Sequence, residues 1–177
     1  MQRKENHMPN VASPLVAVEP GAGELVNLGG LGVHFKIGGA QTAGSMAVVE
    51  HPMDPRRLVP PHTHTKEDEI SYVLEGTIGA RIGDEIAMLE AGSYIFKPRG
   101  VKHTFWNPTD EPARLLEIIV PAGFEVYFAE LAKFIGSGGK PGSPEHQAMS
   151  VPYGLELSGD WIAELKSRYG LKLLGEE

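Results

Sequence analysis

The stretch Pro60–Gly76, PPHTHTKEDEISYVLEG, decides how the rest of the chain is understood. Its two histidines, His62 and His64, stand one residue apart and lead through a cluster of carboxylates into a segment typical of a β-strand. Side chains alternate between the two faces of a strand, so both imidazoles are expected to project to the same side. Two imidazoles on one face can be half of a metal site. Taken alone, they are equally compatible with polar residues on a strand surface.

On either side of this stretch the chain consists of short β-branched or alternating segments. Between Glu24 and Pro121 these segments include GVHFKI (32–37), SMAVVEH (45–51), TIGARI (77–82) and ARLLEIIV (113–120). Turn residues separate them, among them Gly83–Asp84, which predicts a hairpin. Short strands with regularly spaced turns favour a sandwich or barrel over alternating strands and helices.

The pattern changes after Pro121. Apolar residues from Phe124 to Ile135 recur at i, i+4, i+7 and i+11, which predicts one face of a helix. A second helix is expected in DWIAELKSRYG, with Asp160 as its N-cap and Gly170 as its end. We therefore expect an extended N-terminal arm (1–23), a β-barrel (24–121) and a C-terminal helical extension (122–177).

Composition restricts the partners and the kind of metal site. The chain has no cysteine, so disulfides and thiolate metal sites are excluded, and any metal must be held by nitrogen and oxygen. The formal net charge of -7 disfavours nucleic acid, whose binding needs a basic surface. No apolar run is long enough to span a membrane, and we expect a cytoplasmic protein.

A second motif follows the histidine pair. Glu69 stands five positions after His64, and Gly76 closes the first pattern. The second pattern has five defined positions: Gly92, Pro98, Gly100, His103 and Asn107. Together they resemble the paired motifs of the cupin superfamily, H-x-H-x(3,4)-E-x(6)-G and G-x(5)-P-x-G-x(2)-H-x(3)-N. The second motif matches at every defined position. The family usually also has a glycine six positions before the first histidine of the first motif. In this chain that position is Arg56. The chain is also similar to small bacterial cupins that resemble quercetin 2,3-dioxygenase.

The resemblance implies both a fold and a metal site. The fold class is all-β, a double-stranded β-helix or jelly-roll barrel with C-terminal α-helices. His62, His64, Glu69 and His103 would be the metal ligands, and Glu69 could also act as a general base. Such a nitrogen and oxygen set suits one divalent transition metal, Fe, Mn, Ni, Co, Cu or Zn, and leaves positions open for substrate.

Other residues near the motifs have more ordinary interpretations. Glu67 is the rival of Glu69 as carboxylate ligand, but only Glu69 has the family spacing. Asp68 is expected to be a solvated turn residue, and Asn107 to hold a turn. Phe105 should share the inward face of His103 and is a candidate for the wall of the substrate pocket, together with His51. Trp106 would face outward, covered by the C-terminal helix or by a second subunit.

Three functions are compatible with this site, because the same barrel serves many chemistries. The first is a dioxygenase-like oxidoreductase acting on a small aromatic or enolisable molecule. The second is a metal-dependent isomerase or epimerase for a sugar or keto acid, and the third is a non-catalytic cupin that binds a small molecule. Each has a small-molecule ligand, and the resemblance implies a homodimer.

Overall fold

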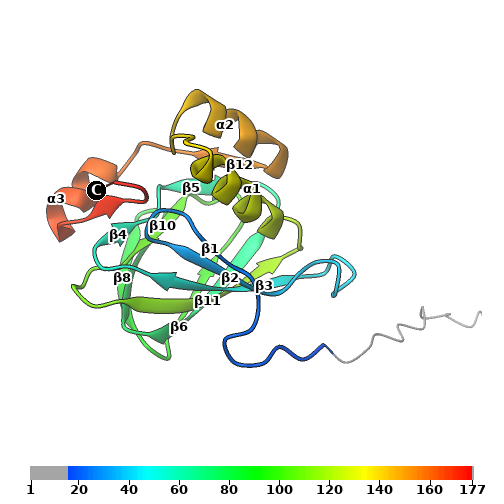
Figure 1. Ribbon diagram of the computed structural model, residues 1–177. Coiled ribbons are helices and arrows are strands. Elements are labelled where there is room, and N and C mark those ends of the chain that lie inside the picture. Colours follow the sequence, from blue (N-terminus) through cyan, green and yellow to red (C-terminus); the bar gives the residue numbers. More distant parts are fainter. Residues whose placement is uncertain (1–15, 177) are drawn as a thin grey trace, which may run out of the picture.

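Two sheets face each other across an apolar interior in the computed structural model, which describes residues 16–176 (Figure 1). The first sheet has six antiparallel strands in the order β1-β2-β3-β11-β6-β9. Their bounds are β1 Leu25–Asn27, β2 Gly32–Ile37, β3 Ala47–Met53, β6 Asp68–Glu75, β9 Tyr94–Lys97 and β11 Ala113–Val120. Of the expected N-terminal arm, residues 1–15 lie outside the described part, and residues 16–23 form no helix or strand.

The second sheet joins strands from before and after the helices. Its order is β12-β5-β10-β4-β13, and β7 extends it by pairing with β10 and with β8. The bounds are β4 Arg57–Leu58, β5 His62–His64, β7 Thr77–Ile82, β8 Glu85–Glu90, β10 His103–Trp106, β12 Leu155–Leu157 and β13 Lys172–Leu173. The hairpin at Gly83–Asp84 is confirmed, since Ile82 pairs with Glu85. The C-terminal extension is thus not only helical: β12 and β13 complete this sheet.

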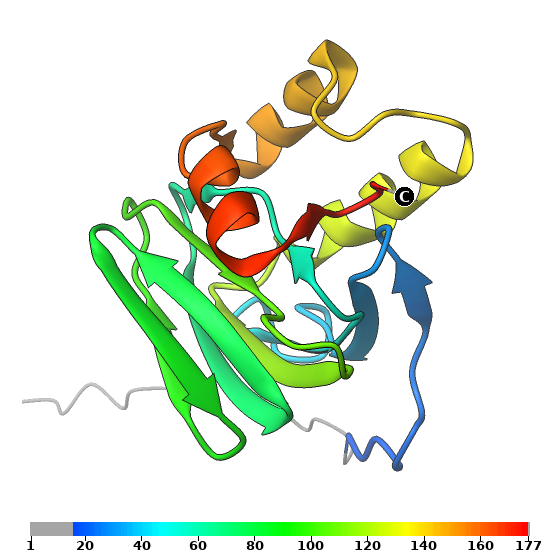
Figure 2. The same ribbon diagram turned by 90° about the vertical axis from the view of Figure 1, so that its left-hand side faces the viewer.

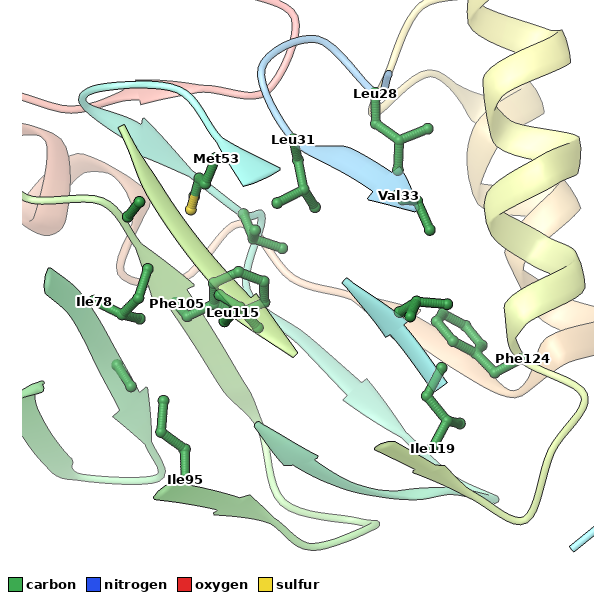
Figure 3. Packing of buried hydrophobic residues seen from close by; sticks show 14 of the residues in the cluster. Leu28, Leu31, Val33, Met53, Ile78, Ile95, Phe105, Leu115, Ile119 and Phe124 are labelled. Carbon is green, nitrogen blue, oxygen red and sulfur yellow. The ribbon is translucent and has the colours of Figure 1, made fainter. Parts of the chain in front are cut away.

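Alternating burial along the strands produces the core. In β3, β6 and β11 every second side chain is buried and the others are partly exposed, as expected for strands with one face toward an interior. Figure 3 shows side chains such as Met53, Leu115 and Ile119 meeting between the sheets. Phe124, at the start of the first helix, points into the same interior. The predicted cupin-type all-β fold with C-terminal helices is confirmed.

Three helices follow the barrel, and a 3-10 turn (Val151–Tyr153) continues the second. Their bounds are α1 Glu125–Gly136, α2 Pro144–Ser150 and α3 Ile162–Tyr169. In Figures 1 and 2, α1 and α2 lie over one end of the barrel, whereas α3 lies at its side. None of the described helices is long and apolar enough to cross a membrane.

The beginning of α3 corrects one prediction. Trp161, with a left-handed φ of 67°, precedes the first helical residue and offers no side-chain cap. Asp160 forms an ion pair with Lys102 instead of capping the helix. This long-range pairing outweighs the local capping preference. The predicted end is confirmed, because Gly170 adopts the left-handed conformation that closes many helices.

A second, smaller core fixes α3 against the barrel. Trp106 faces outward from β10, as predicted, and packs with Leu58, Leu165 and Leu171. The C-terminal helix therefore covers it within the same chain. Gly79 lies beneath the indole ring, and a Cβ atom there would approach Trp106 to 2.2 Å. Any side chain at that position would force this packing apart.

Arg56 shows why the motif usually has a glycine at its position. Its φ of 57° lies in the left-handed region, which glycine adopts without steric cost. Here the guanidinium group stabilises the strained residue through two 2.8 Å contacts with Asp110 and through the carbonyls of Pro108 and Tyr169. The entry turn before β4 therefore forms without the family glycine.

Candidate metal centre

Four side chains from three strands converge at one point inside the barrel. His62 and His64 extend from β5 and His103 from β10 of the second sheet, whereas Glu69 reaches across from β6 of the first. His103 and His62 are direct neighbours in the antiparallel pairing. All four residues are buried, and one potential ligand atom of each lies within 4.8 Å of those of the others. The structure thus brings together the four residues that the motifs singled out.

Backbone carbonyls fix the orientation of two of the imidazoles. The Nδ1 atom of His62 lies 2.7 Å from the carbonyl oxygen of Pro60, and that of His103 lies 2.9 Å from the carbonyl oxygen of Val101. A carbonyl can only accept, so each ring carries its proton on Nδ1. The Nε2 atoms therefore keep their lone pairs, which is the arrangement that metal ligation requires.

His64 lies between the two rival glutamates. Its Nε2 atom is 3.3 Å from Oε1 of Glu69, and its Nδ1 atom is 3.6 Å from Oε2 of Glu67. Glu67 is only 5% exposed and lies behind the ring, outside the cluster of four. Asp68 faces away and pairs with Arg99. The structure thus places Glu69, and not Glu67, in the cluster, whereas sequence spacing does not reveal that Glu67 is buried beside His64.

The arrangement fits a cation. Nε2 of His64 and of His103 are buried without hydrogen-bond partners among the described residues, and each lies 3.3 Å from a carboxylate oxygen of Glu69. Burial, together with the neighbouring imidazoles, holds the pKa of His62 well below its ordinary value, and burial lowers that of His103. Neutral imidazole lone pairs and a carboxylate that face one another without a proton between them need a positive ion. A divalent transition metal would satisfy them.

A charged network that the motifs do not indicate supports Glu69 from behind. The Nζ atom of Lys97, on β9, lies 2.9 Å from Oε2 of Glu69 and 2.8 Å from Oε2 of Glu117. The hydroxyl of Ser71 donates to the same Glu117 carboxylate at 3.1 Å. All four side chains are buried. Lysine and glutamate rarely occupy such positions unless they are paired.

The network sets the charge of the ligand carboxylate. Burial alone would raise the pKa of Glu69, but Lys97, His64 and His103 outweigh it and hold this pKa well below the usual range. Burial raises the pKa of Glu117 to about 7, although Lys97 opposes the shift. Glu69 therefore remains an anion suited to ligation. Its oxygens face the ammonium group of Lys97 and the imidazoles of His64 and His103.

The cluster opens onto an apolar cavity of about 80 Å³. This volume holds several water molecules, each of which needs roughly 10–15 Å³. The two predicted pocket residues, Phe105 and His51, both line it. The far wall consists of residues outside both motifs, which come from α1 and the residue before it, from α2 and from β12. They include Phe124, Tyr127, Phe128, Leu131, His146 and Leu155.

Hydrogen bonds define the structural roles of two further residues, Asn107 and His146. Asn107 holds a turn, as predicted, because its amide donates to the carbonyl of Glu111 at 2.7 Å and its oxygen accepts from Thr109. His146 has no partner at ligand spacing in the sequence. In the structure it bonds to the hydroxyl of Tyr127 at 2.7 Å and thereby joins α2 to α1 over the cavity.

Comparison with known proteins shows what this segment is similar to. Residues 50–119 match the model of the cupin domain family. The tetracenomycin polyketide synthase protein TcmJ of Streptomyces glaucescens is 31% identical over 80 residues, which are 45% of this chain and 52% of that protein. The match thus spans about half the length of this curated relative.

Solved structures agree. The polyketide cyclase RemF from Streptomyces resistomycificus superposes with a TM-score of 0.53 and 26% identity, over 60% of this chain and 80% of that one. KdgF from Halomonas sp. has a TM-score of 0.53 at 16% identity, over 58% and 90%, and shows the fold alone. These relatives do not support the narrower quercetinase-like resemblance. Residues 50–119, which carry the four candidate ligands, are thus similar to cupin domains in sequence, and the chain has the cupin fold.

Proposed function

We propose that the protein is a metal-dependent enzyme that acts on a small enolisable or phenolic molecule. The observation that carries this proposal is the buried cluster of three imidazoles and one carboxylate that opens onto a cavity walled by aromatic side chains. His62, His64, Glu69 and His103 would hold one divalent metal. A metal bound there supplies a Lewis acid that lowers the pKa of a coordinated substrate hydroxyl or enol.

The chain's own residues would prepare the site for such a substrate. Phe105, Phe124 and Phe128 line the cavity and exclude water, which strengthens electrostatic interactions inside it. Lys97 keeps Glu69 in its anionic form. The lowered pKa values of His62 and His103 keep these rings neutral and able to bind metal at neutral pH.

The comparisons favour ring closure over oxidation. TcmJ and RemF are both named for polyketides, a class whose alternating carbonyl groups enolise readily, and RemF is named as a cyclase. An enol carbon of such a molecule can attack one of its own carbonyl carbons and lose water, without any oxidant. This reaction would use a carbonyl polarised by the bound metal and the cavity lined by aromatic side chains beside it.

Dioxygenase activity is the second candidate. Three imidazoles and one carboxylate leave coordination positions for both a substrate oxygen and dioxygen. The same activated substrate would serve either reaction, so dioxygen consumption distinguishes them.

One compound tests both candidates. We would load the purified protein with Fe, Mn, Ni, Co, Cu or Zn in turn and incubate each form with 2,4,6-heptanetrione under argon and under air. Ring closure joins the terminal methyl carbon to the distant carbonyl carbon, releases water and yields 5-methylresorcinol. Formation of this product under argon, abolished by chelator, would support a cyclase.

The remaining outcomes are equally informative. Turnover only in air, with dioxygen consumed, would support the dioxygenase. Metal-dependent binding without turnover of either kind would point to the non-catalytic alternative, and failure to take up any metal would contradict the proposal. The His103→Ala variant is the matched control for reactions of free metal in solution.

A further inference from the structure

We propose that His51 determines specificity by accepting a hydrogen bond, through Nε2, from a hydroxyl group of the bound molecule. This inference rests on the proposed function: the metal centre would hold one substrate oxygen, and His51 would recognise a second oxygen that carries a hydrogen. The cavity would then prefer phenols and enols with two oxygen functions over their methyl ethers.

The backbone fixes which nitrogen of His51 faces the ligand. His51 lies on β3 with its side chain in the interior, and its Nδ1 atom is 2.9 Å from the carbonyl oxygen of Gly32. Because a carbonyl only accepts, the proton of the neutral ring is on Nδ1, and Nε2 carries a lone pair. Burial lowers the pKa of His51 to about 4, so the ring stays neutral at neutral pH.

Other polar groups on the wall are already occupied. Both nitrogens of His146 have partners, the backbone N–H of Gly142 at 2.9 Å and the hydroxyl of Tyr127 at 2.7 Å. The carboxylate of Glu117 is taken by the Lys97 and Ser71 pairing described above. Outside the metal centre, His51 is the histidine among the described cavity-lining residues whose Nε2 has no hydrogen-bond partner.

The surroundings of His51 make this acceptor selective. Its ring lies between two aromatic side chains, with ring centroids 6.3 Å from Phe105 and 5.4 Å from Phe128. A planar ligand beside these rings displaces water, and the lone pair of Nε2 then needs a donor from the ligand itself. A methyl ether supplies no donor and leaves a buried acceptor unpaired, which is unfavourable. The charged groups that act on the ring, Lys97 and Glu69, have opposite signs.

Two substitutions separate recognition from structural support. His51→Asn keeps an amide N–H at about the position of Nδ1, where it can still donate to Gly32, but it removes the acceptor at Nε2. His51→Gln gives up the bond to Gly32 and retains a carbonyl oxygen at about the position of Nε2. The probes are resorcinol and 3-methoxyphenol, which differ only in whether the second oxygen carries a hydrogen.

The experiment measures the dissociation constants of both probes by titration calorimetry, with each protein loaded with the same metal. We expect the wild type to prefer resorcinol by roughly three- to tenfold, as for one net hydrogen bond. The preference should vanish in His51→Asn and survive in part in His51→Gln, while metal content stays unchanged in both.

Each other outcome overturns the inference. If His51→Asn keeps the preference and His51→Gln loses it, His51 only supports the backbone at Gly32. If the wild type binds both probes equally and only with metal, the proposed function stands and this inference is wrong. If neither probe binds the metal-loaded protein, the inference and the proposed phenolic or enolic ligand are both wrong.

Discussion

The two sheets supply different kinds of polar groups to the metal centre. The sheet with β5 and β10 provides its three imidazoles, and two of them, His62 and His103, are each held by the carbonyl two residues earlier. The facing sheet provides charged groups supported from far along the chain. Lys97 is 20 residues from Glu117, and Ser71 is 46 residues from it. The imidazole wall is thus supported locally, whereas the charged wall depends on the completed fold.

The largest effect is expected on the charged wall. Replacing Lys97 by Met leaves Glu69 and Glu117 buried without their counter-ion, which should lower the free energy of unfolding by about 3–5 kcal/mol. Urea denaturation of the metal-free wild type and variant measures this change in the free energy of unfolding. The double variant Lys97→Met/Glu117→Gln removes one of the uncompensated charges and should recover part of the loss. A single variant as stable as the wild type would show that the network contributes little.

On the imidazole wall, His103→Ala should affect metal binding more than folding. The variant loses a ligand, so metal affinity should fall by more than about 100-fold, beyond the effect of removing an outer partner. Circular dichroism should still show the β-barrel. His34→Ala, which changes a histidine on β2 outside the cluster, is the control. Equal metal content in both variants would contradict the ligand assignment.

Glu67→Gln tests whether the carboxylate behind His64 contributes to the centre. Oε2 of Glu67 lies 3.6 Å from Nδ1 of His64. Replacing this carboxylate by an amide should lower the metal affinity of the centre by roughly tenfold, because the carboxylate acts on His64. Asp68→Asn is the matched control, because Asp68 pairs with Arg99 away from the cluster. Metal titration compares the two. A similar small change in both would leave Glu67 without a role in metal binding.

The smallest effect is expected from pH near neutrality. Burial lowers the pKa of His62 and His103, so their neutral, metal-binding forms already predominate above pH 6.5, and metal affinity should change little between pH 8 and 7. Protons compete for the rings only below these lowered pKa values, so affinity should fall at a pH below the 6.5 of an ordinary histidine. A metal affinity that already falls steeply between pH 8 and 7 would contradict ligation by neutral histidines.

The comparison of the two walls also explains what the sequence can predict. Strand alternation places His62 and His64 on one face, and the resemblance to the cupin motifs implies that Glu69 and His103 join them. Lys97 occupies an alternating position in SYIFKP, which resembles any partly exposed strand until β6 and β11 are placed beside it. Its partner Glu117 lies in ARLLEIIV, a largely apolar strand whose other charged residue is Arg114. Such charged pairs depend on register between strands distant in sequence, which no local pattern contains.

The same distinction applies outside the barrel. The apolar period from Phe124 to Ile135 predicted α1 correctly, because one face of that helix packs against the core. The start of α3 could not be predicted from local capping rules, since Asp160 pairs with a lysine from another part of the chain. Nor does sequence show that β12 and β13 return to the second sheet, because strands of two or three residues are too short for a periodic pattern.

The far wall of the cavity has a consequence for how such a protein diversifies. The metal ligands lie within the matched segment 50–119, whereas Phe124, Tyr127, Phe128 and His146 come after it. Substitutions in α1 and α2 can therefore reshape the cavity without changing the candidate ligands. The same metal centre can then be combined with cavities that bind different molecules. For engineering, α1 and α2 are the region to randomise, and β5, β6 and β10 are the region to leave intact.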